Sequence, residues 1–236
     1  MAALLETKGL CYDYPDGTPA LTDVSIRLNE GGKTALIGAN GSGKSTLLML
    51  LAGCFAPSRG EVLLRGEPAG QDLWMLKNSA GLVFQEPDDQ LFMPSVLEDA
   101  AFGLVARDVP AEEARAIARA CLEKLGIQHL ADRPPHRLSG GEKRSAALAG
   151  ILAMKPEIIL LDEPSASLDP RARRNLIGTL RELDKTMVIA THDLEMASAL
   201  CDAAVLLFKG RVAGEGFMGC PENSLMDEKF LRDHGL

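Results

Sequence analysis

Apolar residues along this chain of 236 residues fall into two kinds of short run. Near the N-terminus, apolar and polar positions alternate between turn residues, which predicts an antiparallel sheet; these runs are 4–14, 24–28 and 61–65. Farther along, continuous apolar runs indicate strands that are buried on both faces, as in a parallel sheet; these runs are 34–37, 81–84, 158–161, 187–190 and 205–208.

Between two of these buried runs the spacing becomes helical. The segment 95–154 is rich in alanine, and within it apolar residues recur every three or four positions between Pro110 and Gly126, which are typical helix boundary residues. We therefore expect one domain: an α/β core formed by 1–94 and 155–216, an inserted helical subdomain at 95–154, and a short C-terminal tail at 217–236.

A glycine-rich segment, G-A-N-G-S-G-K-S-T, joins the first buried run to a helical run at 46–52. It fits G-x-x-x-x-G-K-[ST], in which glycines let backbone N–H groups surround a phosphate at a helix N-terminus. The lysine serves the β- and γ-phosphates in catalysis, and the serine that follows it ligates Mg²⁺. The residues expected to bind ATP and Mg²⁺ here are Gly38, Asn40, Gly41, Ser42, Gly43, Lys44, Ser45 and Thr46.

Two acids, Asp162 and Glu163, follow the buried run 158–161. They would lie at the carboxyl end of a core strand, where ligands of α/β sheets bind. We expect Asp162 to hold Mg²⁺, directly or through water, and Glu163 to polarise an attacking water as general base. On its own the segment would also fit a turn that leaves a strand, but the glycine-rich loop upstream favours the catalytic interpretation.

The segment Ser139-Gly140-Gly141-Glu142 opens a helix that is expected to end before Pro156. Its serine and glutamate fit the capping-box pattern S-x-x-E. Capping alone does not call for two glycines, because each weakens a helix, whereas close approach of backbone N–H groups to an anion does. We expect the segment to cap its helix and also to offer the helix N-terminus to a phosphate.

In this order, the segments resemble the nucleotide-binding subunit of an ABC transporter over nearly the whole chain. The segments 38–46 and 158–163 match the Walker A and Walker B motifs, and 138–142 is similar to the LSGGQ signature with Glu142 in place of glutamine. The resemblance assigns roles to residues outside these segments: Tyr14 stacks on adenine, Gln85 is the Q-loop glutamine, Asp169 lies in the D-loop and His192 is the switch histidine.

The resemblance implies an ABC-type P-loop NTPase fold, with a mostly parallel core sheet, an N-terminal antiparallel β subdomain and an inserted helical subdomain. It implies a head-to-tail dimer with a second copy or a paralogue, in which Ser139 and Gly141, flanking Gly140, contact the partner's ATP. His192 would stabilise the γ-phosphate and hold the attacking water. Gln85 would bind Mg²⁺ or water and report the nucleotide state to a membrane partner.

The segment 85–92, Q-E-P-D-D-Q-L-F, is similar to the ATPases of energy-coupling-factor uptake systems, especially those for cobalt or nickel. In such systems a pair of ATPases drives an integral membrane scaffold, and a separate membrane protein captures the substrate. The region after Gln85 would dock the scaffold. Nearby acids would meet basic residues there or form a solvated surface; they are Asp88, Asp89, Glu98 and Asp99. We do not expect them to bind metal, because histidine and cysteine ligands are missing from the cluster.

Composition and charge limit the possible partners and the cellular location of the protein. The formal net charge of −8 argues against a nucleic-acid partner. No apolar run approaches the 18 residues or so of a membrane span, and early charges argue against a signal peptide, so we expect no direct membrane insertion. The resemblance to an ABC transporter subunit implies a peripheral protein at the cytoplasmic face of the cell membrane. Five widely spaced cysteines predict reduced thiols.

Three alternatives remain open. Among transport ATPases, the chain would be the subunit of another importer or of an exporter. The segment 86–92 argues against this alternative. A soluble ABC ATPase of DNA repair or translation would carry a coiled-coil insertion or a second ATPase domain, neither of which is evident. A phosphate-loop kinase would leave the signature helix without a purpose.

Overall fold

The computed structural model describes residues 3–70 and 73–217, and it divides into two compact units. The sheet unit contains Met1–Leu82, Glu157–Glu163 and Asp184–Leu236, and the helical unit contains Val83–Pro156 and Pro164–Leu183. The helical unit is therefore larger than the expected insertion at 95–154, because α6 (Pro170–Glu182), which follows the acidic pair Asp162 and Glu163 in the chain, packs against α5 (Gly140–Ala153). The expected tail lies, after Phe217, outside the described residues.

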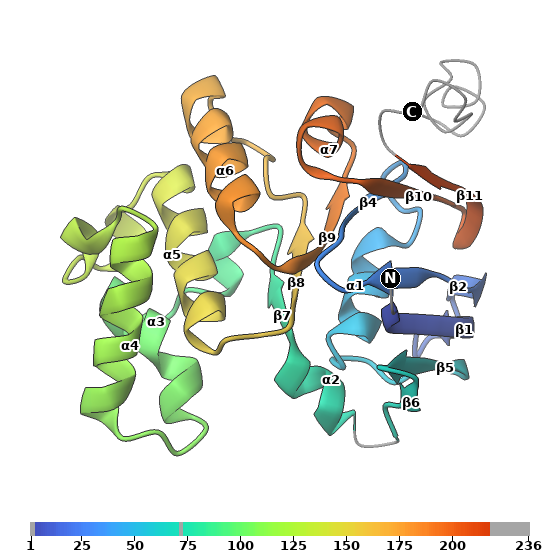
Figure 1. Ribbon diagram of the computed structural model, residues 1–236, viewed down its shortest axis with the longest axis horizontal. Coiled ribbons are helices and arrows are strands. Elements are labelled where there is room, and N and C mark those ends of the chain that lie inside the picture. The colour runs from blue at the N-terminus through green and yellow to red at the C-terminus, as the bar shows by residue number, and fades with distance from the viewer. Residues whose placement is uncertain (1–2, 71–72, 218–236) are drawn as a thin grey trace. The chain divides into compact units, whose positions relative to one another are not determined.

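The sheet unit begins with a five-stranded antiparallel sheet in the order β2-β1-β5-β6, with β3 also paired to β1 (Figure 1). Buried positions alternate with less buried ones in only part of β1, because Leu4 and Leu5 are both buried and so are Leu10 and Cys11. The strands are β1 (Ala3–Asp13), β2 (Pro19–Val24), β3 (Arg27–Asn29), β5 (Arg59–Leu64) and β6 (Glu67–Pro68).

The sequence pattern is wrong about one strand of this sheet. The run 24–28 was expected to be continuous, but the structure ends β2 at Val24 and starts β3 at Arg27. Asp23 has a left-handed φ of 56°, and the Thr7 hydroxyl bonds both sides of the break, donating to the Val24 carbonyl and accepting from the Ile26 N–H. This contact comes from a distant strand, so local alternation gives no sign of it.

The second sheet of this unit has six strands in the order β11-β10-β4-β9-β8-β7, parallel from β10 through β8, with β11 antiparallel at its edge. Its central strands are buried along their whole length, in agreement with the continuous apolar runs. The strands are β4 (Lys33–Ile37), β7 (Ala80–Val83), β8 (Ile158–Asp162), β9 (Thr186–Thr191), β10 (Ala203–Phe208) and β11 (Arg211–Phe217).

Among its described residues, the sheet unit has three helices: α1 (Lys44–Leu51), α2 (Trp74–Ser79) and α7 (Leu194–Leu200). The first helix packs against β8 and β9 and also touches β2, so apolar side chains cover most of its circumference. Leu47, Leu48, Leu50 and Leu51 are completely buried. This burial anchors the helix whose first turn follows the glycine-rich loop.

The helical unit contains the Ala-rich segment, with α3 and α5 packed together and α4 against both. Ser95 caps α3 by accepting the Glu98 N–H. The helices are α3 (Val96–Val105), α4 (Ala111–Lys124), α5 (Gly140–Ala153) and α6 (Pro170–Glu182), with single turns η1 (Pro87–Asp89), η2 (Gln128–Leu130) and η3 (Pro135–Arg137).

Candidate functional site

The glycine-rich loop connects the carboxyl end of β4 to the first turn of α1. Gly38 is confined by its neighbours, because a Cβ at this position would overlap the Leu207 carbonyl and the Ser42 hydroxyl. Gly43 has a φ of 104°, which side chains rarely adopt, and it directly precedes α1. The Ser42 hydroxyl is buried without a hydrogen-bond partner among the described residues. The loop therefore has the close backbone and spare polar group that suit a phosphate.

The side chain of Lys44 is folded over this loop. Its Nζ atom donates to the carbonyl oxygens of Gly38, at 2.7 Å, and Ala39, at 3.3 Å. It also lies 3.5 Å from Oε1 of Glu163, and both side chains are almost completely buried. A concentrated positive charge is thus held at the mouth of the loop, beside an acid.

Asp162 ends β8 and hydrogen-bonds the Ser45 hydroxyl. Burial raises the pKa of the Asp162 carboxyl, the Ser45 bond opposes this, and the adjacent Glu163 raises the pKa further. Within the described chain, Oδ1 of Asp162 is buried without a hydrogen-bond partner. A hard divalent cation would satisfy this oxygen and favour the ionised carboxyl, so Ser45 and Asp162 fit Mg²⁺.

The two carboxylate oxygens of Glu163 lie close to two different side chains. Oε2 is 2.9 Å from Nδ1 of His192, and Oε1 faces Lys44. Its backbone has a left-handed φ of 42°, held by a 2.8 Å bond from its N–H to the Ala190 carbonyl. A backbone of this kind costs a non-glycine residue about 1–3 kcal/mol and is concentrated at functional sites. The carboxylate is accordingly fixed in one orientation, as a group that polarises a water must be.

Tyr14 lies just after β1, and its hydroxyl is 2.8 Å from the Thr46 hydroxyl. Its ring packs edge-on against Tyr12, with centroids 5.3 Å apart, and Tyr12 stacks on Phe55. Sequence reasoning missed both supporting rings. Tyr12 had a usable signal, since it lies two positions before Tyr14, whereas Phe55 is remote in sequence.

The remaining expected site residues belong to the helical unit. Gln85 is exposed, and its carbonyl accepts a 2.7 Å bond from Arg144. Asp169 caps α6, and its bonds from Ala172 N–H and Arg171 N–H lower the pKa of its carboxyl. Sequence reasoning also missed Arg144, which is 4% exposed.

Ser139 caps α5 together with Glu142, in the reciprocal capping box that the sequence predicts. The Glu142 carboxylate accepts from the Ser139 hydroxyl at 2.7 Å and from its N–H at 2.8 Å. These two bonds lower the pKa of Glu142. A Cβ on Gly141 would lie 3.1 Å from the Ala172 side chain, so a larger residue would crowd α6. A Cβ on Gly140 would point into open space.

The structure thus gathers one group of the expected residues in the sheet unit: Tyr14, the loop residues Gly38 to Thr46, Asp162, Glu163 and His192. The other group belongs to the helical unit: Gln85, Ser139, Gly140, Gly141 and Asp169.

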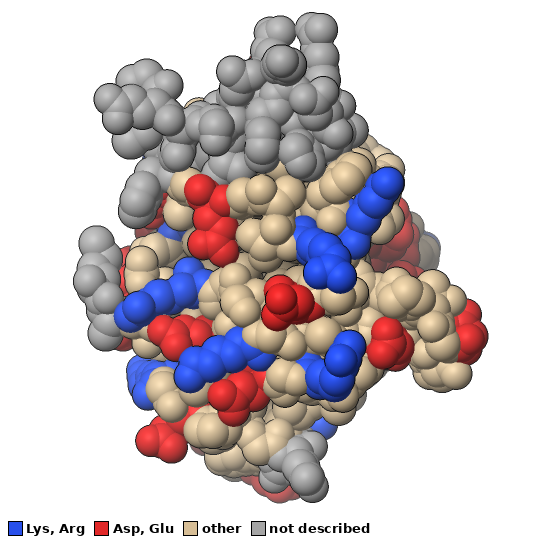
Figure 2. Space-filling model, turned by 90° about the vertical axis from the view of Figure 1, so that its right-hand side faces the viewer, with Lys and Arg blue, Asp and Glu red and all other residues tan. Residues whose placement is uncertain are grey.

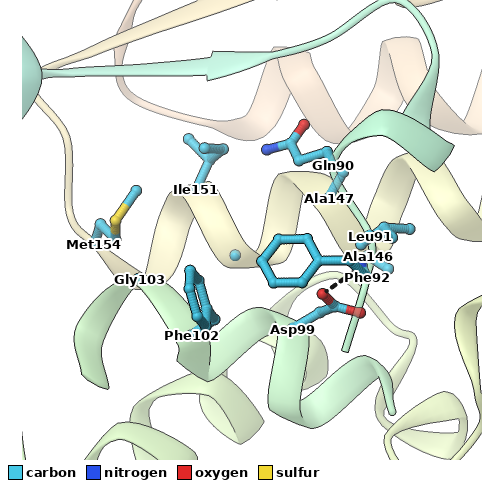
Figure 3. Close-up of a pocket in the computed structure, with 11 residues that line it drawn as sticks. Gln90, Leu91, Phe92, Asp99, Phe102, Gly103, Ala146, Ala147, Ile151 and Met154 are labelled. Atoms are coloured by element: carbon cyan, nitrogen blue, oxygen red, sulfur yellow. Dashed lines mark hydrogen bonds between the residues drawn. The ribbon is translucent and has the colours of Figure 1, made fainter. Parts of the chain in front are cut away.

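The helical unit also carries an apolar cavity of about 140 Å³ between α3 and α5, which we call the α3/α5 groove. Its floor is formed by Ala146, Ala147, Gly150 and Ile151 of α5 and by Met154, which directly follows the helix. Figure 3 shows Phe92 and Phe102 side by side in the groove, with one ring edge-on to the other and centroids 4.9 Å apart. Both rings are well exposed, at 63% and 43%. Exposed aromatic rings around a concave apolar surface mark an interaction site.

Two surface properties bear on partners. On the face drawn in Figure 2, basic residues (blue) and acidic residues (red) are interspersed. They do not form the continuous basic stripe that is typical of a surface that binds duplex DNA. None of the helices within 3–70 and 73–217 combines the length with the apolar character that crossing a bilayer requires.

Comparison with known proteins agrees with the geometry. Residues 21–166 match the family model described as ABC transporter. A putative ABC transporter ATP-binding protein of Geobacter sulfurreducens is 46% identical over 214 residues, covering 90% of this chain and 86% of the relative. The energy-coupling factor transporter ATP-binding protein EcfA of Methanocaldococcus jannaschii is 39% identical over 239 residues, covering 99% and 85%.

Solved structures give the same result. The structure of cbiO1 from Clostridium perfringens, part of the ABC transporter complex cbiONQ, superimposes with a TM-score of 0.84 at 37% identity, covering 98% of this chain and 93% of that one. A dimeric ATP-binding cassette in a post-hydrolysis state, bound to ADP and Pi, has a TM-score of 0.80 at 29% identity, covering 91% and 98%.

Proposed function

This chain belongs to the ABC transporter family as an ATPase subunit, and from that premise we propose that it drives an energy-coupling-factor uptake system for cobalt or nickel ions. The relationship to EcfA and to cbiO1 supports the system, and the segment 85–92 supports the choice of metal. The single observation that carries the chemistry is the buried Glu163 carboxylate held between Lys44 and His192.

The hydrolytic roles follow from this arrangement. Lys44 binds the terminal phosphates beside the loop. Glu163 accepts a proton from the attacking water, and His192 fixes the orientation of the Glu163 carboxylate. Ser45 and Asp162 hold Mg²⁺, which neutralises charge on the phosphates when bound. Tyr14, supported by Tyr12, offers its ring to the adenine.

The helical unit supplies the other half of each site, to a second copy of the chain or a paralogue. Ser139 and the two glycines at the start of α5 offer a hydroxyl and free N–H groups to the partner's nucleotide. The dimeric cassette with ADP and Pi supports this pairing. Because one chain contains both half-sites, a homodimer is sufficient for two competent sites.

Changing Ser139 to arginine tests the dimer. We expect hydrolysis to fall about 10²-fold, the scale of losing one donor to a developing anion, while monomeric ATP binding is unchanged. Hydrolysis and nucleotide titration on the purified chain measure both. Ser139→Thr is the matched control, because it keeps the hydroxyl and the helix cap. Loss of ATP binding by the Ser139→Arg monomer would contradict a contact to the partner's nucleotide.

The α3/α5 groove is proposed to receive the membrane scaffold. Of the acids expected to help, Asp88 already pairs with Lys143, Glu98 pairs with Arg115, and Asp99 accepts the Phe92 and Met93 N–H groups. Burial raises the pKa of Asp99, and these two backbone bonds oppose the rise. Docking therefore rests mainly on the apolar groove.

Phe102→Lys tests this docking surface. We expect recovery of the membrane partner to fall at least about tenfold, because an exposed aromatic anchor is replaced by a charge in an apolar groove. Val105→Lys is the matched control, since Val105 is equally exposed, at 45%, on the same helix but outside the groove. Equal recovery of the partner by both variants would remove the groove as the docking site.

Purification of the chain from its native membranes in mild detergent tests the function itself. A small scaffold with a separate capture protein, together with ATP-dependent uptake of labelled cobalt or nickel, is the expected result. A conventional permease pair would keep the transport ATPase and reject the subgroup. Recovery of water-soluble partners alone would favour a non-transport ATPase.

A further inference from the structure

The helix α5 takes part in two separate surfaces. Its first turn contains the glycines of the signature segment, and its later turns, from Ala146 to Ile151, form most of the floor of the α3/α5 groove (Figure 3). A continuous α-helix of this length moves as one stiff body. A ligand in the groove and a nucleotide at the first turn therefore bear on the same rigid element.

Two consecutive residues join α5 to the segment that borders the groove. Nζ of Lys143 lies 2.6 and 2.8 Å from the two carboxylate oxygens of Asp88, in η1. The next residue, Arg144, donates to the Gln85 carbonyl and to the Pro164 carbonyl. The segment that starts at Gln85 and continues to Phe92 in the wall of the groove is thus held to the first turns of α5 at two points.

The two attachments differ in character. Arg144 is buried, and it serves carbonyl groups that would otherwise lose their partners, so it maintains the fold. Lys143 is 18% exposed in its side chain and Asp88 is 65% exposed, so their pair adds little to stability. An ion pair that spans 55 residues, engages both carboxylate oxygens and adds little stability is suited to fixing the position of a loop.

We propose that Lys143 and Asp88 are positioning residues that clamp the docking segment to the signature turn of α5, so that seating of the membrane scaffold in the groove is transmitted to the partner's nucleotide. The proposal rests on the proposed function. In the isolated chain Arg144 keeps α5 in place, so the clamp is not needed for basal hydrolysis. In the complex, loss of the clamp leaves the segment held at Gln85 by Arg144, and the residues from Asp88 onward can then move without α5.

The test compares Lys143→Met, Asp88→Asn and the charge-swapped double variant Asp88→Lys/Lys143→Asp. Each is measured as purified chain, for kcat and KM of ATP hydrolysis, and as the complex recovered from membranes, for labelled metal ions transported per ATP hydrolysed. We expect both single variants to keep basal kcat and KM within about twofold and to lower transport per ATP at least fivefold. The double variant should recover at least half of the loss.

The controls separate the possible explanations. Arg115→Met breaks the surface pair with Glu98 in the same unit and should leave transport per ATP unchanged. If Asp88 instead contacts the scaffold directly, the swap will not rescue, and the clamp is overturned. Normal coupling in Lys143→Met overturns it as well. If the wild-type chain yields no membrane complex, the proposed function fails, and the clamp fails with it.

Discussion

Replacing Glu163 with glutamine is expected to leave ATP binding intact and to lower hydrolysis by about 10²–10⁴-fold, the usual contribution of a positioned general base. The amide keeps the shape of the side chain and a bond to His192, but it cannot accept a proton from water. Bound ATP should then trap the dimer. Steady-state hydrolysis and size-exclusion chromatography with ATP and Mg²⁺ measure the two effects.

The chain provides a matched control at the opposite end of the same strand. Glu157 directly precedes β8, whereas Glu163 directly follows it, and Glu157 forms a 2.6 Å ion pair with Arg65. Glu157→Gln should retain hydrolysis within about twofold, since this pair lies at a partly exposed surface. Near-normal turnover by Glu163→Gln would exclude Glu163 as the base.

Lys44→Ala is expected to weaken ATP binding at least about 30-fold. The estimate follows from the ~2 kcal/mol lower bound for truncating one partner of a buried, hydrogen-bonded charge pair. The variant also leaves Glu163 without its buried cation, so ATP would meet an unscreened carboxylate. Equilibrium titration with a fluorescent ATP analogue measures the affinity.

Lys33→Ala serves as the companion variant, because Lys33 opens β4 whereas Lys44 follows the loop at its other end. Its affinity for ATP should equal that of the wild type. Thermal unfolding of both variants distinguishes a lost contact from a lost fold. Unchanged affinity in a folded Lys44→Ala protein would contradict the assignment of the phosphate loop.

The parts of the site that the sequence predicts are those whose determinants are local. The loop from Gly38 to Thr46 contains its own glycines, cation and hydroxyls, and apolar residues on either side define the strand and helix that hold it. The same holds for Ser139 and Glu142, which lie within one helical turn and form the predicted capping box. Apolar runs likewise identify the buried strands of the core sheet to within about two residues.

Contacts between residues remote in sequence could not be predicted. His192 was expected to act on the γ-phosphate, and its contact with Glu163 depends on the pairing of β8 with β9. The ion pair of Lys143 with Asp88 depends on how η1 packs against α5. The left-handed backbone of Glu163 could not be predicted either, because glutamate rarely adopts this conformation.

Two opposing contributions to stability meet at position 163. Glycine there would relieve about 1–3 kcal/mol of backbone strain, and asparagine would relieve part of it. Both changes would also leave the buried Lys44 ammonium without its acidic neighbour, and breaking a buried ion pair costs about 3–5 kcal/mol. Selection of this chain for heat resistance alone should therefore retain the glutamate, so the residue proposed to act as the base is kept by stability as well as by turnover.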